Sequence, residues 1–154
     1  RSSQPEIITV EGKKNVESLL YDYNEEWQKN IMQYEQIVWG YQDSSYFREY
    51  QSYAEHYWKV RAKYQRRYRI LLFSDKANWE ADLGRKHQVA EREFRSLPLG
   101  VEITSTLWVG GEYIIMISCR ESPHFAVQIR NRWMATNLIT VFRLLWHYSD
   151  PKRG

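Results

Sequence analysis

The stretch VEITSTLWVGGEYIIMISC, residues 101–119, gives the clearest indication of the fold. Its first half alternates apolar residues with polar or aromatic ones, and the apolar positions are Val101, Ile103, Leu107 and Val109. This spacing predicts a strand over 101–109. Gly110 and Gly111 favour a tight hairpin, and the apolar run 113–119 predicts the returning strand. We therefore expect an antiparallel pair of strands here.

The segment after this pair predicts one more strand and a final helix. A turn at Ser122-Pro123 precedes the strand, whose alternating apolar residues are Phe125, Val127 and Ile129. The helix opens at Asn131 or Arg132 and is apolar nearly all round, so it is either buried or meets another subunit through one face. The residues expected in that core or interface are Leu138, Phe142, Leu145 and Trp146.

Upstream, strands and helices are expected to alternate. A β-rich run at 7–10 predicts the first strand, and apolar residues three and four apart predict a helix from Lys13 to about Gln33. Residues 35–41 predict the second strand. A second helix is expected with Ser45 as its N-cap, and its apolar stripe is Tyr46, Tyr50, Tyr53, Tyr57, Val60 and Tyr64. These tyrosines either pack the helix on the sheet or line a ligand cleft or subunit contact.

The remaining segments complete the expected topology. Residues 68–74 predict a buried strand, the polar segment 75–87 predicts an irregular, mobile loop with room for a short helix, and 92–97 predict a short strand. The order is therefore β-α-β-α-β, followed by an antiparallel meander and a C-terminal helix. Such an order predicts an α/β domain with a mixed sheet.

Composition places limits on the class of protein. The 154 residues suit a single domain, which we expect at 5–148 between tails at 1–4 and 149–154. Hydrophobic residues at 43% and charged residues at 27% exclude a disordered or low-complexity chain. No apolar run is long enough to span a membrane, and no leader opens the sequence. One cysteine, Cys119, can form no internal disulfide, so we expect a cytoplasmic protein.

The net charge of +3 is too small to predict a nucleic-acid-binding protein by itself. One segment, the basic run 59–69, nevertheless contains no acid. Its cations are Lys59, Arg61, Lys63, Arg66, Arg67 and Arg69, with Tyr64 and Tyr68 between them. These side chains either contact phosphates and stack on bases or form a solvated helix face. The small net charge favours the solvated face.

Several short motifs follow one another along the chain. In order they are Pro5-Glu6-Ile7, Glu11-Gly12, Arg95-Ser96-Leu97-Pro98, Val101-Glu102-Ile103, Gly110-Gly111, Ser122-Pro123, Val127-Gln128-Ile129, Ala135 and Phe142-Arg143-Leu144-Leu145-Trp146. With these motifs, the chain from Pro5 to Trp146 resembles the phospholipase-D-like domain of TrmB-type transcriptional regulators. The resemblance implies a phospholipase-D-like mixed sheet and a non-catalytic domain that senses an effector or forms a homodimer. It also implies a small-molecule effector, no cofactor, and DNA contact only through a helix-turn-helix domain absent from this sequence.

Enzymes of the phospholipase-D type use His-x-Lys followed by Asp, and the histidine attacks phosphorus. None of the four histidines fits this motif. The lysine after His56 comes three residues later instead of two. No lysine stands two residues after His87, His124 or His147. A Gly-x-Gly-x-x-Gly motif, a P-loop, a Gly-x-Ser-x-Gly motif and metal-ligand spacing are also absent from the sequence. We therefore expect no enzyme and no metal site, with a degenerate phosphodiesterase as the alternative.

Ligands of open α/β sheets bind beyond the carboxyl ends of the parallel strands. The candidates that follow the second and third predicted strands are Tyr41, Asp43, Ser44, Ser45, Ser74, Asp75 and Lys76, and we expect Glu102 and Trp108 to face the same cleft. Because turns and helix caps need the same residue types, a purely structural role is the alternative.

Overall fold

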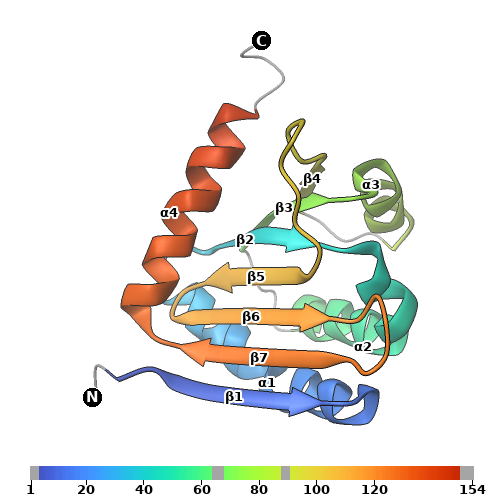
Figure 1. Cartoon of the computed structure of the whole chain (residues 1–154), viewed down its shortest axis with the longest axis vertical. Coiled ribbons are helices and arrows are strands. Elements are labelled where there is room, and N and C mark those ends of the chain that lie inside the picture. The colour runs from blue at the N-terminus through green and yellow to red at the C-terminus, as the bar shows by residue number, and fades with distance from the viewer. Residues whose placement is uncertain (1–3, 64–67, 88–90, 150–154) are drawn as a thin grey trace.

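A computed structural model of the chain describes residues 4–63, 68–87 and 91–149. Within these ranges, seven strands form one mixed sheet and four helices cover it (Figure 1). The strand order across the sheet is β1-β7-β6-β5-β2-β3-β4. In chain order the elements are β1 (Glu6–Glu11), α1 (Lys13–Met32), β2 (Ile37–Gln42), α2 (Ser44–Lys63), β3 (Arg69–Ser74), α3 (Ala77–Lys86), β4 (Arg92–Arg95), β5 (Thr106–Gly110), β6 (Tyr113–Ser118), β7 (Phe125–Arg130) and α4 (Arg132–Tyr148).

The expected α/β class with a mixed sheet is confirmed. Strands β2, β3 and β4 run parallel to one another, whereas β5, β6 and β7 form an antiparallel meander. Strand β5 joins the two halves because it pairs antiparallel with β2, and β1 closes the far edge by pairing with β7. No helix within the described ranges combines the length and the apolar character needed to cross a membrane.

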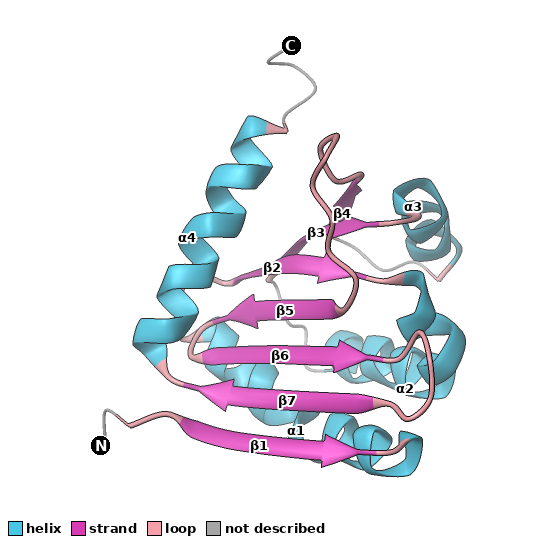
Figure 2. Ribbon diagram, viewed as in Figure 1, coloured by secondary structure: helices cyan, strands magenta, loops and turns pink. Residues whose placement is uncertain are grey.

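The two faces of the sheet support separate cores. Helices α1 and α2 cover one face and α4 crosses the other (Figure 2). In β3, Ile70 and Leu72 face α1 and α2, while Leu71 and Phe73 lie under α4. Since both faces of this strand are buried, its apolar residues form the continuous run seen in the sequence.

Two glycines are required by close backbone contacts. Gly40 in β2 has φ +137°, and a Cβ placed there would lie 1.8 Å from the carbonyl oxygen of Leu107 in β5. Gly111 has φ +56° in the β5–β6 hairpin, where its Cβ would meet Asn30 Oδ1 at 2.2 Å. Any other residue would strain the backbone or separate these elements.

The segment expected to be an irregular loop forms α3. Its buried positions are Ala77, Glu80 and Gly84, which follow helical spacing but are small or charged. Leu83 packs beside them against the core. The irregular loop expected over 75–87 is therefore wrong for most of its length, and the short helix for which that expectation left room is present.

Strand β5 is shorter than predicted, because it begins at Thr106 rather than Val101. Its neighbour β2 pairs with it only as far as Tyr41, just before that strand gives way to α2. The alternation over 101–105 consequently has no strand beside it, and those residues form a loop.

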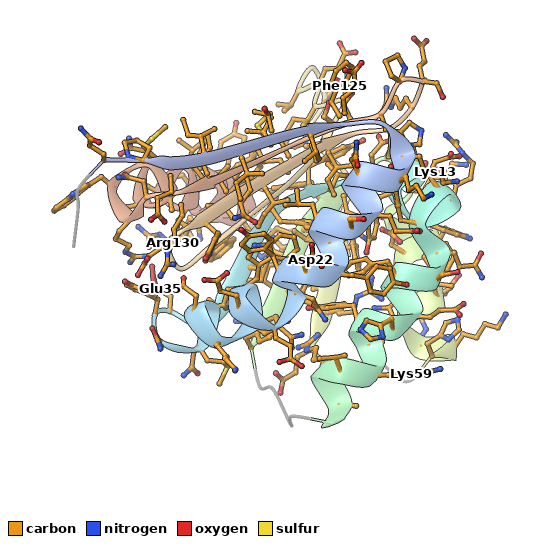
Figure 3. All side chains as sticks on the ribbon, turned by 90° about the horizontal axis from the view of Figure 1, so that it is seen from below. Lys13, Asp22, Glu35, Lys59, Phe125 and Arg130 are labelled. Atoms are coloured by element: carbon orange, nitrogen blue, oxygen red, sulfur yellow. The ribbon has the colours of Figure 1, made fainter. Side chains whose placement is uncertain are left out.

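Helix α2 bears out the expected tyrosine stripe in part. Tyr46, Tyr50 and Tyr53 are buried against the sheet and α1, Tyr57 is half-buried, and Tyr64 lies outside the described residues. The helix is kinked at Tyr50, where φ −129° and ψ 37° depart from helical values. The kink divides α2 into a first part that follows the sheet and a second part that diverges from it (Figure 3).

The apolar final helix is divided between core and surface. Leu138, Phe142, Leu145 and Trp146, for which core and interface were both open, pack on the sheet with Trp39 and Phe73. The exposed apolar side chains of α4 are others, namely Trp133, Met134, Val141, Leu144 and Tyr148. Homodimerisation itself stays a prediction.

We expect Phe142→Ala to lower the free energy of unfolding by about 3–5 kcal/mol, because it leaves a cavity under α4. Leu144→Ala is the matched control, since that side chain is 64% exposed and its truncation should cost less than about 0.5 kcal/mol. Urea unfolding followed by circular dichroism measures both. Equal losses in the two variants would show that α4 is oriented differently on the sheet.

Candidate functional site at the carboxyl edge of the sheet

Polar side chains gather where the carboxyl ends of β2, β3 and β6 meet the beginning of β5. These strand ends share one edge because β6 runs parallel to β2, with β5 antiparallel between them. In Figure 1 the edge lies at the right, at the arrowheads of β2 and β6. We call the residues Tyr41, Asp43, Ser45, Thr106 and Arg120 the Asp43 cluster.

Asp43 is the centre of this cluster. Its carboxylate accepts hydrogen bonds from the hydroxyls of Tyr41 (2.6 Å) and Ser45 (2.5 Å) and from the guanidinium of Arg120 (2.7 Å). Its own backbone N–H donates to Thr106 Oγ1 at 3.0 Å. One residue, through its side chain and its backbone N–H, therefore connects β2, α2, β5 and the loop after β6.

The environment of Asp43 favours its charged form. The side chain is only 3% exposed, and burial by itself raises the pKa of a carboxyl. Hydrogen bonds from Arg120, Ser45 and Tyr41 outweigh burial and lower the pKa of Asp43 from 3.8 to about 2. Burial and the bond to Asp43 raise the pKa of Tyr41, which therefore stays a neutral donor.

Asp43, and not Ser45, caps α2. The backbone N–H of Ser45 donates to Asp43 Oδ2 at 3.3 Å, and the helix already begins at Ser44. Ser44 in turn donates from its backbone N–H and its hydroxyl to the two carboxylate oxygens of Asp75, at 2.8 and 2.7 Å. Two carboxylates thus take up donors at the N-terminus of α2, as helix electrostatics favour.

The sequence candidates separate into two groups and two single residues. Tyr41, Asp43 and Ser45 belong to the Asp43 cluster. The neighbouring group at the end of β3 is Ser44, Ser74, Asp75 and Lys76. Glu102 is exposed in the loop before β5. Trp108 lies on the α2 side of the sheet, where its indole N–H donates to Gln42. The expectation that Trp108 joins the edge site is therefore wrong.

Sequence reasoning missed a histidine at this edge. His124 is 4% exposed, and its Nδ1 lies 2.5 Å from the hydroxyl of Tyr50. Its Nε2 lies 3.6 Å from Glu49 Oε1, and Lys13 Nζ approaches the same oxygen at 3.6 Å. The four residues come from α1, α2 and the β6–β7 loop, so no sequence motif predicts that they lie together. They are Lys13, Glu49, Tyr50 and His124. They are called the His124 group below.

Cys119 connects the His124 group with the Asp43 cluster. Its thiol lies 3.4 Å from the Ser45 hydroxyl, and the β6–β7 loop carries Cys119, Arg120 and His124 together. Burial raises the pKa of the thiol, so it is a neutral packing group and not a thiolate nucleophile. Among the residues that the structure describes, no group of three or more His, Cys, Asp or Glu side chains could hold a metal ion.

The basic run divides into structural and exposed members. Arg61 is buried, donates to the carbonyl oxygen of Tyr68 and lies 4.5 Å over its ring. It therefore belongs neither to the favoured solvated face nor to the alternative contact with nucleic acid. Lys59 and Arg69 are exposed. The Lys63 side chain, Arg66 and Arg67 lie outside the described residues. Figure 3 shows Lys59 on the part of α2 that points away from the sheet, while Lys13 lies at the sheet edge.

Comparison with known proteins gives a likeness in structure only. No family model and no curated protein sequence matches the chain. Among solved structures, NucT from Helicobacter pylori matches with a TM-score of 0.55, over 94% of this chain and 97% of that one, at 5% sequence identity. The chain has a phospholipase-D-like fold. The finer resemblance to TrmB-type regulators stays a prediction.

The likeness corrects two expectations. NucT is a nuclease of the phospholipase-D superfamily, so the expected non-catalytic regulatory domain of a transcription factor is overturned. The expectation that the chain is not an enzyme is overturned by the same finding. A search for His-x-Lys examines residues close together in sequence, so it could not find the His124 group, whose members come from three separate elements.

The low pKa of Asp43 predicts a defined pH dependence. Because the folded state lowers this pKa from 3.8 to about 2, the charge stabilises the fold above pH 4, and that contribution is lost as pH falls toward 2. Asp43→Asn should therefore lower the free energy of unfolding by about 2 kcal/mol at pH 7, and the difference should vanish near pH 2. Urea unfolding across this pH range measures it.

Asp82→Asn is the control for this prediction. Asp82 is 68% exposed in its pair with Arg85, so its loss should change stability by less than about 0.5 kcal/mol. A cost of Asp43→Asn that stays constant from pH 7 to pH 2 would show that its charge is not the source of the stabilisation.

Proposed function

We propose that this domain binds nucleic acid. The observation that carries the proposal is the fold shared with NucT, which extends over nearly the whole of both chains. Two members of the basic run, Lys59 and Arg69, add support because they are exposed. Phosphate contacts by lysine and arginine supply most of the sequence-independent affinity for nucleic acid.

The buried thiol of Cys119, which forms no disulfide, suits a reducing compartment, so we propose that the protein acts in the cytoplasm.

Lys59 and Arg69 are the two cations on which the proposal can be tested. Both are exposed, in contrast to Arg61, whose guanidinium is bound to the backbone of Tyr68. The aromatic residues of the run do not add a stacking surface, since Tyr68 is buried and Tyr57 is half-buried and hydrogen-bonded to it. The proposal therefore rests on the charge of the two cations.

The double variant Lys59→Gln/Arg69→Gln should weaken binding to a single-stranded oligonucleotide. Each lost phosphate contact lowers the slope of log K against log salt by about 0.7, so the slope should fall by about 1.4. The matched control, Lys14→Gln/Lys29→Gln, removes the same charge from exposed positions of α1. Fluorescence anisotropy across a salt series measures both variants, and an equal fall in the control would show that binding is not located at the basic run.

A second candidate function is phosphodiester hydrolysis at the carboxyl edge, and the geometry of His124 favours it. The imidazole is held at Nδ1 by the Tyr50 hydroxyl, and burial raises the pKa of Tyr50, so the phenol stays neutral. When Nδ1 donates its proton to the Tyr50 oxygen, Nε2 carries the lone pair that a nucleophile needs. The Lys13 ammonium, which shares the Glu49 oxygen with His124, supplies positive charge for the phosphoryl oxygens.

His124→Gln should reduce hydrolysis of an end-labelled single-stranded oligonucleotide at least about 100-fold. His56→Gln is the control, because His56 is exposed on α2 beside the ring of Tyr21. Since His124 is buried, Tyr50→Phe serves as a second variant that keeps the ring and removes the bond to Nδ1, and thermal unfolding of each variant checks folding. A wild-type chain that binds the oligonucleotide without cleaving it would contradict the catalytic candidate and leave the binding proposal standing.

A further inference from the structure

A pocket lies between α1, α2 and the sheet, away from the carboxyl edge. Its cavity volume is about 70 Å³, several times what one water molecule needs. Aromatic rings from both helices and from β5 form its walls, namely Trp27, Tyr46, Tyr53, Tyr57, Trp58 and Trp108. The pocket therefore offers aromatic rings to a ligand.

Two amide side chains on α1 form a polar strip in this aromatic wall. Asn24 and Gln28 are 2% and 1% exposed, and their spacing of four residues places them on one face of the helix. Gln28 Nε2 donates to Asn24 Oδ1 at 3.1 Å, and the Tyr53 hydroxyl donates to the same oxygen at 3.3 Å. Within the described part of the chain, Asn24 Nδ2 and Gln28 Oε1 then have no hydrogen-bond partner.

This donor and acceptor persist whichever way the amides are assigned. If both amides are turned over, Asn24 donates to Gln28, and the unused atoms become one carbonyl oxygen and one amide nitrogen in exchanged positions. A buried polar group without a partner costs about 1–3 kcal/mol. Because Asn24 and Gln28 both line the pocket, their unpaired donor and acceptor form a recognition edge for a molecule that presents an acceptor and a donor.

A third polar group lies on the opposite wall. Arg92 of β4 has its guanidinium 5.4 Å over the ring of Trp58, and its Nη1 finds no acceptor among the residues described. Glu80, whose pKa burial raises to about 7, accepts a 2.6 Å bond from Gln42 Nε2, and the Gln42 oxygen accepts from Trp108 at 3.2 Å. The pocket thus offers one further donor, at Arg92, to an oxygen of its ligand.

We infer that this pocket binds a nucleobase. A nucleobase is a flat heterocycle whose pairing edge carries an acceptor beside a donor, which matches the strip formed by Asn24 and Gln28. Stacking on the surrounding rings holds any base, since every base has a π-face. The ligand is either a free base or nucleoside, or a base turned out of a strand, and the inference does not require the basic run.

The test uses the tryptophan fluorescence of the chain, because Trp27, Trp58 and Trp108 line the pocket. Adenine, uracil and their ribosides are titrated, with toluene as a flat ring that lacks the edge. Adenine or uracil should quench the emission with a saturable isotherm that toluene does not reproduce. Saturable quenching by toluene alone, or by neither base, would overturn the inference and leave a pocket whose amides are hydrated.

Gln28→Met and Asn24→Leu remove the recognition edge while keeping side-chain volume. Each should weaken base binding at least about tenfold, because the bound base is left without a partner. The melting temperature should stay the same or rise in Gln28→Met, which removes an unsatisfied buried oxygen. It should fall in Asn24→Leu, because Gln28 Nε2 and the Tyr53 hydroxyl lose their acceptor. Gln51→Met is the control, because that amide is exposed on α2 and bonded to Glu55. Unchanged base affinity in both pocket variants would overturn the inference.

The two sources of the base are separated with oligonucleotides. A strand with bases and the same strand with one abasic position are compared for quenching, in the wild type and in Lys59→Gln/Arg69→Gln. Free-base quenching that survives in the double variant supports the pocket whatever becomes of the nucleic-acid proposal. Quenching by the complete strand but not at the abasic position, abolished by Asn24→Leu, supports a base supplied by a strand.

Discussion

The buried carboxylate of Asp43 is the constraint on which the carboxyl edge depends. It caps α2 and holds the β6–β7 loop through Arg120, while the backbone N–H of the same residue joins β5 through Thr106. Without this carboxylate, the guanidinium of Arg120 and the N-terminus of α2 would lose their shared acceptor. The loop that carries His124 would then lose its ion pair with Asp43. The ordering of the His124 group therefore rests on a residue that need not touch a substrate.

Much of the fold was predictable because its signals are local. The helix α1, the Gly110-Gly111 turn and the Asn131 cap of α4 each follow from residues within one turn of each other. Helix α3 was not predictable, since Glu80 and Gly84 occupy its buried face. The buried carboxyl of Glu80 accepts a hydrogen bond from Gln42 and is favoured in its charged form by Arg92. These two residues belong to β2 and β4, outside the helix.

The candidate site shows the same division. Asp43, Ser44 and Asp75 follow parallel strands, so the rule for ligand positions in open sheets located them. Arg120 and His124 lie in a turn between antiparallel strands, to which that rule does not apply. Their partners, Asp43 and Tyr50, are more than seventy residues away in the sequence. A histidine in a turn becomes recognisable only when the tertiary contacts that orient it are known.

The kink at Tyr50 makes one helix serve two sites. The turns before it carry Ser45 and Glu49 to the carboxyl edge, and the turns after it supply Tyr53, Tyr57 and Trp58 to the aromatic pocket. Tyr50 itself bonds His124. Any ligand that moves the second half of α2 therefore acts on the hinge beside the imidazole. By thermodynamic reciprocity, whatever an occupied pocket does to affinity at the edge, an occupied edge does to affinity at the pocket.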